Sequence, residues 1–477
     1  MSEELGITVK KGEDPSEWYK QVVLKGEFAD YSPVKGCIVF RPLGYGIWER
    51  IMEEFDKILK EHGVKNTYFP LFIPESFLKK EAEHFEGFVP EVAWVTMAGE
   101  KKLEEKLAVR PTSETIMYAM FSKWIKSYKQ LPLRINQWCN VVRWETKMTK
   151  PFLRGREFLW HEAHTVHESE EEAREEVFWA INAYKKFVEE YLAIPVIAGY
   201  KTESEKFAGA EFTTTIETLM PDGKALQMGT AHMLGQNFSK PFEVKFLGRD
   251  EKWHYAWQTS WGISTRLVGA VILVHGDDKG AIIPPKIAPI QIVIVPIIFK
   301  EKEKEIMEAC REVKNALEEK FRVVLDDRRD YTPGWKFNEW ELKGVPLRIE
   351  IGPKEIKEGK VVIARRDTGE RVKVNREEII EKVEREIEEM QKRLLEKARA
   401  EIEKRTKKVK ELEELKKEIE RGNWAIGEYC GSSECEEKIK EMCGAEPRVI
   451  PFGSKAKGKC IACGKKAKYV VYWARAY

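Results

Sequence analysis

Apolar residues recur along this chain at two spacings, and each change of spacing marks a new element. From residue 37 a short apolar run precedes apolar positions three and four residues apart. Gly63 separates these positions from another run, which ends at a proline. This order predicts a strand, an amphipathic helix that stops at the glycine, and a second strand. We expect mixed α/β structure to continue to about residue 278.

A second pattern begins after Pro284 and Pro285, which interrupt the chain before a continuous apolar run over residues 290–298. Such a run is typical of a fully buried strand. A helix over residues 302–320, a strand over 322–326, another helix, a strand over 347–351 and a strand pair over 360–374 would complete a small α/β unit. Because 477 residues exceed the size of a single core, we divide the chain into residues 1–283, 284–375 and 376–477.

Residues 376–421 contain no Gly or Pro and combine dense Glu, Lys and Arg with apolar positions at helical spacing. The apolar positions are Ile380, Val383, Ile387, Met390, Leu394 and Ala398. This pattern predicts a long amphipathic helix or a helical hairpin. It favours a solvated linker helix over a coiled coil that binds a partner.

Residues 141–165 carry too many charges for a core strand and too many large aromatics for a loop, which suggests the wall of a binding site. If the chain is extended from Arg154, one face presents Arg156, Phe158, Trp160, Glu162 and His164. Phe158 and Glu162 would then lie about 13 Å apart, at roughly 3.3 Å per residue. That length accommodates a nucleotide base at one end and a small charged substrate at the other.

The overall charge excludes a globally basic nucleic-acid binder, because 82 Lys and Arg nearly cancel 80 Asp and Glu and leave a net charge of +2. A local basic segment exists at residues 448–477, which contain no acidic residue; it suits phosphate contact or a merely soluble surface. The N-terminus lacks a basic region followed by an apolar one, and no window reaches about 18 apolar residues. We therefore expect a cytoplasmic protein without a membrane span.

Five of the eight cysteines lie in the last fifth of the chain. Cys430 and Cys435 are separated by four residues, and Cys460 and Cys463 by two, as in a zinc knuckle. Four thiolates suit a closed, structural Zn²⁺ site, and this spacing favours a metal over unrelated free thiols or a disulfide framework. Cys443 is a spare thiol that could replace one of the four on spacing alone.

Three separated segments together resemble the motifs of class II aminoacyl-tRNA synthetases. Arg143-Trp144-Glu145 and the later Arg154-Gly155-Arg156-Glu157-Phe158 resemble motif 2. Gly262-Ile263-Ser264-Thr265-Arg266, before an apolar helix, resembles motif 3, and residues 41–74 resemble motif 1. Further segments narrow the resemblance to prolyl-tRNA synthetases of the archaeal and eukaryotic type. They are Pro111-Thr112-Ser113-Glu114, the run from Phe158 to Thr165, Phe207-Ala208-Gly209-Ala210, Gln227-Met228-Gly229-Thr230-Ala231-His232, and the cysteine-rich C-terminus ending in Tyr477.

The resemblance covers essentially the whole chain and implies a multidomain α/β fold. Its parts would be a catalytic domain on an antiparallel sheet, an α/β anticodon-binding domain and a C-terminal zinc-binding α+β domain. The family position favours Cys430, Cys435, Cys460 and Cys463 as the zinc ligands. Motif 1 implies a homodimer, and the family suggests that residues 473–477 fold back onto the catalytic domain.

The implied activity is ATP-dependent ligation of L-proline to tRNA(Pro) through prolyl-adenylate, with Mg²⁺ beside the ATP. By resemblance ATP is bound by Arg143, Glu145, Arg154, Phe158, Gln227, Thr230 and Arg266, of which Arg143 and Arg266 are catalytic. Proline is bound by Thr112, Glu114, Arg143, Trp160, Glu162, Phe207, His232 and Ser264. Arginine suits phosphate and carboxylate, whereas carboxylates beside aromatic walls suit an ammonium on an apolar ring.

Each of these residues also has a plainer interpretation. An arginine taken singly more often makes a surface ion pair, and a single tryptophan or histidine more often belongs to a core. Glu341, Arg348 and Lys354 are the expected anticodon contacts, although charges at a strand edge explain them almost as well.

Two rival functions stay open at this stage. A non-catalytic tRNA-binding paralogue need not keep Arg143, Arg154, Gln227 and Arg266 together. A class II synthetase for threonine, serine, glycine or histidine would not need the walls of Trp160 and Phe207. The segment between motifs 2 and 3 is too short for the large editing domain of bacterial relatives. A ring pocket rejects smaller amino acids by only about 1–3 kcal/mol, so activation of alanine or cysteine is also open.

Overall fold

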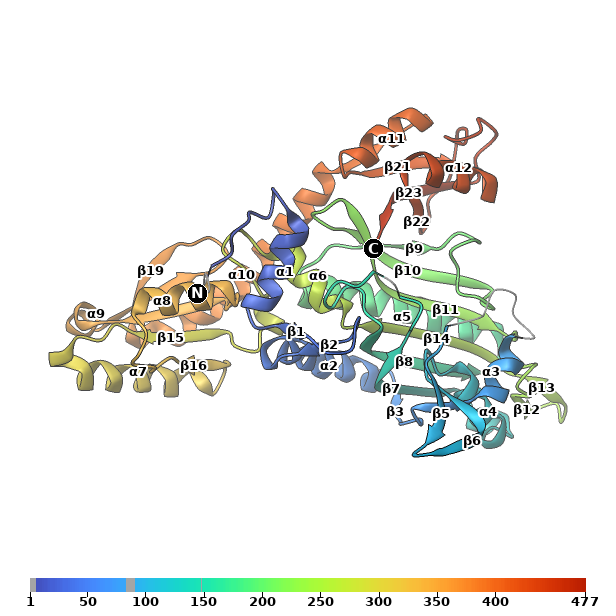
Figure 1. Cartoon of the computed structure of the whole chain (residues 1–477), viewed down its shortest axis with the longest axis horizontal. Coiled ribbons are helices and arrows are strands. Elements are labelled where there is room, and N and C mark those ends of the chain that lie inside the picture. Colours follow the sequence, from blue (N-terminus) through green and yellow to red (C-terminus); the bar gives the residue numbers. More distant parts are fainter. Residues whose placement is uncertain (1–5, 83–90, 147) are drawn as a thin grey trace.

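The computed structural model describes residues 6–82, 91–146 and 148–477, and the strands in these ranges form five sheets (Figure 1). The largest sheet has eleven strands, and its middle part is the antiparallel sheet that the resemblance implies for a catalytic domain. A separate five-stranded sheet lies at the left of Figure 1, and the C-terminal elements, in red, lie at the upper right. No helix among the described residues is long and apolar enough to cross a membrane.

The N-terminal elements follow the predicted order, with one difference. Helix α1 (Pro15–Lys25) and strands β1 (Ala29–Tyr31) and β2 (Ile38–Phe40) precede α2 (Pro42–Glu61), which ends just before Gly63. The apolar run after the glycine forms two strands instead of one, β3 (Lys65–Asn66) and β4 (Phe72–Pro74). Pro70 lies between them and has no N–H to donate to a ladder, so the two halves join different sheets.

The middle of the large sheet holds six long or medium strands in the order β9, β10, β11, β14, β8, β7. They are β9 (Ile197–Tyr200), β10 (Phe212–Leu219), β11 (Lys224–Gly235), β14 (Trp257–Ser264), β8 (Glu157–His167) and β7 (Leu133–Val142). Strand β8 pairs antiparallel with both neighbours without a register shift. The predicted alternation of faces therefore holds from Glu157 to His167.

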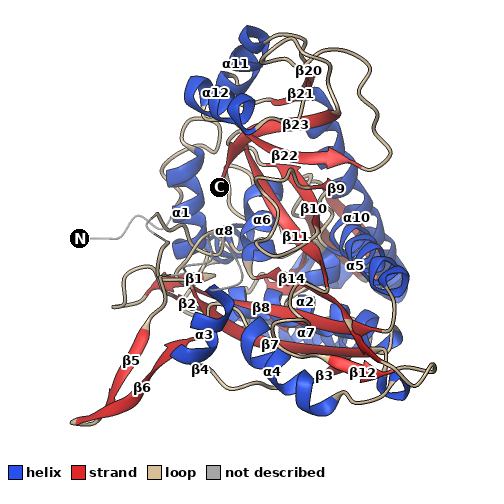
Figure 2. Ribbon diagram, turned by 90° about the vertical axis from the view of Figure 1, so that its right-hand side faces the viewer, coloured by secondary structure: helices blue, strands red, loops and turns tan. Residues whose placement is uncertain are grey.

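Helices α2, α5 (Glu170–Tyr191) and α6 (Arg266–His275) share a hydrophobic core with one face of this sheet (Figure 2). Smaller elements gather near the β7 side. They are α3 (Glu75–Ala82), β5 (Trp94–Ala98), β6 (Lys101–Val109), α4 (Glu114–Trp124), η1 (Tyr128–Gln130), β12 (Lys245–Leu247) and β13 (Trp253–Tyr255). Strands β5 and β6 form a hairpin that projects from the body of the molecule. The opposite face of the sheet is left for the cavity described below.

The predicted α/β unit is confirmed. Strands β15 (Ile292–Pro296), β16 (Val323–Leu325) and β17 (Leu347–Ile351) are parallel, and β18 (Lys360–Arg365) and β19 (Arg371–Asn375) extend the sheet antiparallel. Its helices are α7 (Glu303–Glu318), α8 (Pro333–Leu342) and α9 (Pro353–Glu358), and the short helices η2 (Pro285–Ile287) and η3 (Lys300–Lys302) precede them.

The prediction of a long amphipathic helix or a helical hairpin over residues 376–421 is confirmed for residues 379–404, but the rest of the range differs. The elements in chain order are η4 (Arg376–Glu378), α10 (Ile379–Lys404), β20 (Thr406–Lys408) and α11 (Leu412–Glu420). Strand β20 interrupts the helical segment because it pairs with β21 (Trp424–Tyr429), which follows α11. The three residues of β20 form a strand only because β21 pairs with them, and such a tertiary contact leaves no pattern in the local sequence.

The prediction that helix α10 is a solvated linker is wrong. Val383 belongs to the core of the five-stranded unit, whereas Met390 and Leu394 pack with Ala193 and Ile282 of the catalytic region. The helix therefore joins the two regions through buried side chains.

The C-terminal residues extend the large sheet. Helix α12 (Ser433–Cys443) lies beside β22 (Glu446–Pro451) and β23 (Tyr469–Ala476); β22 pairs with β9 and β23 pairs with β11. Tyr477 donates a hydrogen bond to Asp222, and Lys150 and Lys224 lie 5.2 and 5.3 Å from the centre of its ring. The expectation that the last residues fold back onto the catalytic domain is confirmed.

His161 lies on the core face of β8, with both ring nitrogens bonded. Nδ1 lies 2.8 Å from Asn136 Oδ1, and Nε2 lies 2.9 Å from the hydroxyl of Tyr184. The amide oxygen can only accept, so Nδ1 carries the proton and Nε2 accepts from the tyrosine. Burial lowers the pKa of His161 to about 3, and the ring is therefore neutral when the protein is folded.

We expect the free energy of unfolding to decrease as the pH falls from 6.5 towards 4. Below its ordinary pKa of about 6.5, His161 binds a proton in the unfolded chain but not in the folded one. At pH 5 this difference lowers the free energy of unfolding by about 2 kcal/mol. Urea unfolding at pH 7 and pH 5 measures this loss. His161→Phe should show a smaller loss than the parent, whereas the surface variant His254→Gln should match the parent. An identical loss in His161→Phe would contradict the assignment.

Candidate functional site

One face of β8 lines a cavity of about 430 Å³ with the side chains of Phe158, Trp160, Glu162 and His164. Arg156, which was expected on the same face, does not line it. The strand begins one residue later, and the Arg156 guanidinium lies 4.4 Å from the ring centre of Trp144. The remaining alternation agrees with the prediction.

Two buried carboxylates form one end of the cavity. Glu162 projects from β8 and accepts hydrogen bonds from Ser113 and from Gln137 Nε2, the latter at 2.6 Å; His164 Nε2 lies 3.3 Å from it. Glu114 is the first residue of α4 and accepts a hydrogen bond from Thr112. Local loop geometry and strand pairing therefore bring together residues that are far apart in the sequence.

The two carboxylates have different proton affinities. Burial raises the pKa of Glu114, and the neighbouring Glu162 adds to this effect. Burial also opposes ionisation of Glu162, but the hydrogen bonds from His164, Ser113 and Gln137 outweigh it and lower the pKa. A cationic ammonium between the two groups would favour the ionised form of both.

Aromatic rings form the wall next to these carboxylates. The rings of Phe207 and His232 lie 4.7 Å apart, and Trp160 stands edge-on to Phe158 at 5.7 Å. His232 Nδ1 lies 2.9 Å from the hydroxyl of Thr213, and burial lowers the pKa of His232 to about 3. The histidine is therefore neutral and suits contact with an apolar ring.

Two arginines provide the cationic lining. Arg143 lies with its guanidinium carbon 5.4 Å from the ring centre of Phe158 and donates to the carbonyl of Pro111. Arg266, at the start of α6, donates through Nη1 to the carbonyl of Gln227 at 3.1 Å and through Nε to that of Leu153 at 3.2 Å. Both side chains donate to backbone carbonyls, and neither forms an ion pair with a carboxylate among the described residues, so each can bind an anion.

The cavity brings together all but one of the residues that the sequence selected for substrate binding. They are Thr112, Glu114, Arg143, Glu145, Phe158, Trp160, Glu162, Phe207, Gln227, Thr230, His232, Ser264 and Arg266. Arg154 instead lines an adjoining cavity of about 30 Å³ that also contacts Phe158. The hydroxyl of Thr230 lies 3.2 Å from His232 Nε2, which places it beside the aromatic wall.

Several lining or supporting residues were not predicted. Gln137 lies directly opposite Glu162 in the β7–β8 ladder, a relation that the alternation of the two strands could have revealed. Ser260 of β14 has a buried hydroxyl that has no hydrogen-bond partner within the described ranges, and it lines the cavity. Glu205 comes from an irregular loop, which carries no periodic signal.

The expected anticodon contacts are only partly brought together. Arg348 of β17 bonds Glu341 at 3.1 Å and Glu350 at 3.0 Å, whereas Lys354 lies in α9 beyond the other end of the strand. A stacked pair of rings was missed: Tyr331 and Trp335 lie 3.9 Å apart with an interplanar angle of 19°.

Arg328 lies 5.0 Å from the ring centre of Tyr331, beside this stacked pair. Aromatic rings with a nearby guanidinium are typical of surfaces on which unpaired bases stack.

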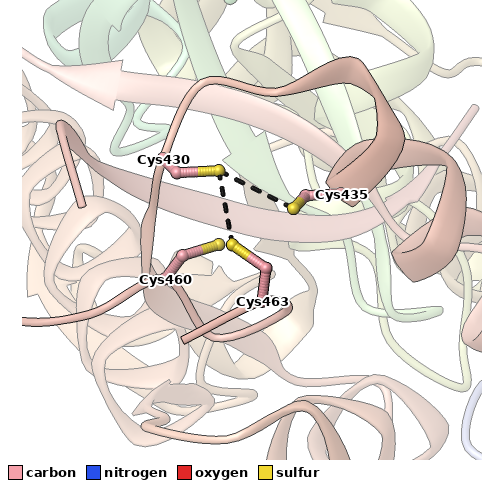
Figure 3. Close-up of side chains that lie close together, drawn as sticks. All are labelled: Cys430, Cys435, Cys460 and Cys463. Atoms are coloured by element: carbon pink, nitrogen blue, oxygen red, sulfur yellow. Dashed lines mark hydrogen bonds between the residues drawn. The ribbon is translucent and has the colours of Figure 1, made fainter. Parts of the chain in front are cut away.

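The four predicted ligand cysteines point toward one another (Figure 3), and their sulfur atoms all lie within 4.8 Å. Cys430 Sγ is 3.6 Å from Cys435 Sγ and 3.8 Å from Cys463 Sγ. A tetrahedral ion with metal–sulfur bonds of about 2.3 Å requires sulfurs about 3.8 Å apart. Cys443 lies outside the group and donates to the carbonyl of Ile439, so the group of four can hold a metal ion without it.

Family models match three parts of the chain. Residues 95–275 match the class II tRNA synthetase core domain shared by the G, H, P, S and T enzymes, and residues 291–386 match an anticodon-binding domain. Residues 412–477 match the C-terminal domain of prolyl-tRNA synthetase.

Curated relatives and a solved structure match nearly the full length. The proline–tRNA ligase of Natranaerobius thermophilus is 53% identical over 98% of this chain and 97% of its own length. That of Cenarchaeum symbiosum is 52% identical over 99% of this chain and 100% of its own length. The crystal structure of prolyl-tRNA synthetase from Cryptosporidium parvum, complexed with halofuginone and AMPPNP, is 43% identical. It has a TM-score of 0.95 and covers 99% of this chain and 97% of its own.

Proposed function

The chain belongs to the prolyl-tRNA synthetase family, and from this premise we propose that it ligates L-proline to tRNA(Pro) with ATP through a prolyl-adenylate. The observation that carries the proposal is the polarity of one cavity. Its carboxylates and aromatic wall suit the ammonium and ring of proline, and its arginines suit the phosphates of ATP.

Activation joins two anions, the proline carboxylate and the α-phosphate, and a cation must hold them together. Arg143 is proposed for this role because its guanidinium lies beside the aromatic rings of both Phe158 and Trp160, 5.4 and 5.5 Å from their centres, and can donate to both anions. Arg266 would bind the outer phosphates, joined by Arg154 once ATP occupies the site. Rate acceleration then comes from positioning and charge neutralisation, without a protein nucleophile.

The remaining polar groups would orient the nucleotide. Glu145 is proposed to accept from the adenine amino group while Phe158 stacks on the base. Gln227 and Thr230 offer oxygen atoms to the sugar or to the Mg²⁺ that accompanies ATP. At the proline end Thr112, Glu114 and Glu162 would hold the ammonium, while Trp160, Phe207 and His232 would enclose the ring and Ser264 would border it.

The tRNA would contact a separate region. We assign activation to residues 1–283 and anticodon recognition to residues 284–375. Glu341, Arg348 and Lys354 are proposed contacts, and the stacked Tyr331 and Trp335 would support unpaired bases. The cytoplasm is the proposed compartment because tRNA charging supplies translation.

Amino-acid dependence of pyrophosphate exchange into ATP tests this function. Proline should support exchange, threonine, serine, glycine and histidine should not, and alanine and cysteine should give at most slow exchange. Arg143→Ala should abolish the proline signal, because removing a buried guanidinium at the reacting centre typically costs 10²-fold or more. Arg421→Ala, on the surface of the C-terminal region, is the matched control. Exchange that does not depend on proline would refute the assignment.

We propose Zn²⁺ as the ion held by the four cysteines, with a structural role, since all four tetrahedral positions are filled by thiolates and none is left for substrate. The purified protein should contain about one zinc per chain, as measured by elemental analysis. Cys460→Ser should lose the zinc and lower the melting temperature, whereas Cys443→Ser should retain it. Loss of zinc in Cys443→Ser and retention in Cys460→Ser would reverse the ligand assignment.

A homodimer is the proposed assembly, with motif 1 at the interface. Exposed apolar side chains near this motif support it, among them Tyr45, Tyr68 and Phe72. Analytical ultracentrifugation at micromolar concentration should give the mass of two chains. Tyr68→Glu, at a side chain that is 73% exposed, should shift the equilibrium towards the monomer, and a parent protein that sediments as a monomer would exclude this assembly.

A further inference from the structure

A buried ionic group links the C-terminal region to the catalytic sheet. Glu217 of β10 is fully buried and accepts from Lys201 Nζ at 2.7 Å and from Arg448 Nη2 at 3.1 Å. Arg448 belongs to β22, so the arginine crosses between the two regions. The sequence pattern placed Arg448 in a basic surface segment, but it is only 6% exposed.

Glu217 stands at an irregularity in the sheet. Ile216 pairs with Gly229 and Glu217 pairs with Gln227, so Met228 is an extra residue on β11. Such a bulge bends a strand and redirects its side chains, and all three residues of the bulged segment line the cavity. Glu217, which Lys201 and Arg448 contact, therefore lies opposite the bulge.

The bulge in turn holds the cationic end of the cavity. The carbonyl of Gln227 accepts from Arg266 Nη1, so the backbone opposite Glu217 fixes one side of this guanidinium. Burial lowers the pKa of Arg266 to about 10, and Glu217 is the strongest charge that opposes this effect. A continuous path of contacts thus runs from Arg448 through Glu217 and Gln227 to Arg266.

We propose that Arg448 and Glu217 are positioning residues for ATP, through which the C-terminal region sets the place of Arg266. The inference rests on the proposed function. Arg448 is expected to affect the binding of ATP and not that of proline. The reason is that the path of contacts reaches the arginine end of the cavity and not Glu114 or Glu162.

Pyrophosphate exchange with ATP and proline titrated separately tests this idea. Arg448→Met in the full-length protein should raise the KM for ATP roughly tenfold, the usual effect of losing one charge-assisted contact, and leave the KM for proline within about twofold. Arg421→Met is the control: this arginine belongs to the same region, its exposed side chain pairs with Glu418, and both KM values should stay unchanged.

A second variant covers the case in which Arg448→Met does not fold, since Glu217 and Lys201 would be left as a buried pair. Arg448→Lys keeps the charge but lacks the planar fork of donors that arginine presents to a carboxylate, and it should give a smaller rise in the KM for ATP alone. An unchanged KM for ATP in the folded variants, or equal changes for ATP and proline, would overturn the proposal. A parent protein without proline-dependent exchange would instead overturn the function itself.

Discussion

The site depends on one constraint, the unbroken pairing of β8 with a strand on each side. Because its register with β7 and β14 does not shift, four successive outward positions all face the cavity. The inward positions meet a closed core, where His161 is bonded on both ring nitrogens. A slip by one residue would exchange the two faces and bury Glu162 against apolar helices. The two sides of the strand therefore stabilise a single register.

This arrangement buries charged side chains, which is unfavourable, and hydrogen bonds to each charged group offset the loss of hydration. Glu162 is ionised because Ser113, Gln137 and His164 surround it, whereas the less supported Glu114 has a raised pKa. Arg143 and Arg266 donate to backbone carbonyls, and within the described part of the chain neither forms an ion pair with a carboxylate. Carbonyls orient a guanidinium without neutralising it, so the positive charge stays available for phosphate.

The sequence predicts what local spacing can encode. The strand faces of β8 and the buried strand β15 follow from periods of a few residues, and the structure agrees with them. The cysteine gaps predicted a group of four thiols, the family position selected its members, and the structure brings these four together. Three features could not be predicted from the sequence because they depend on residues that are distant in the chain. Strand β20 forms on β21, Arg448 is buried by Glu217, and Arg154 turns into a neighbouring cavity. Local composition suggested a helix at the first position and a surface charge at the second, and the family resemblance implied a cavity residue at the third.

The C-terminal region is best understood as part of the catalytic sheet and not as an appended domain. An open edge at β9 would present unpaired backbone groups to solvent and to other chains. Strand β22 covers that edge, and β23 pairs with the start of β11, two residues after Asp222, which binds the last tyrosine. The cysteine group anchors the loops that follow β21 and precede β23. The cysteine group, the protection of the edge and the burial of Arg448 therefore involve the same few strands, and these strands adjoin the arginine end of the cavity.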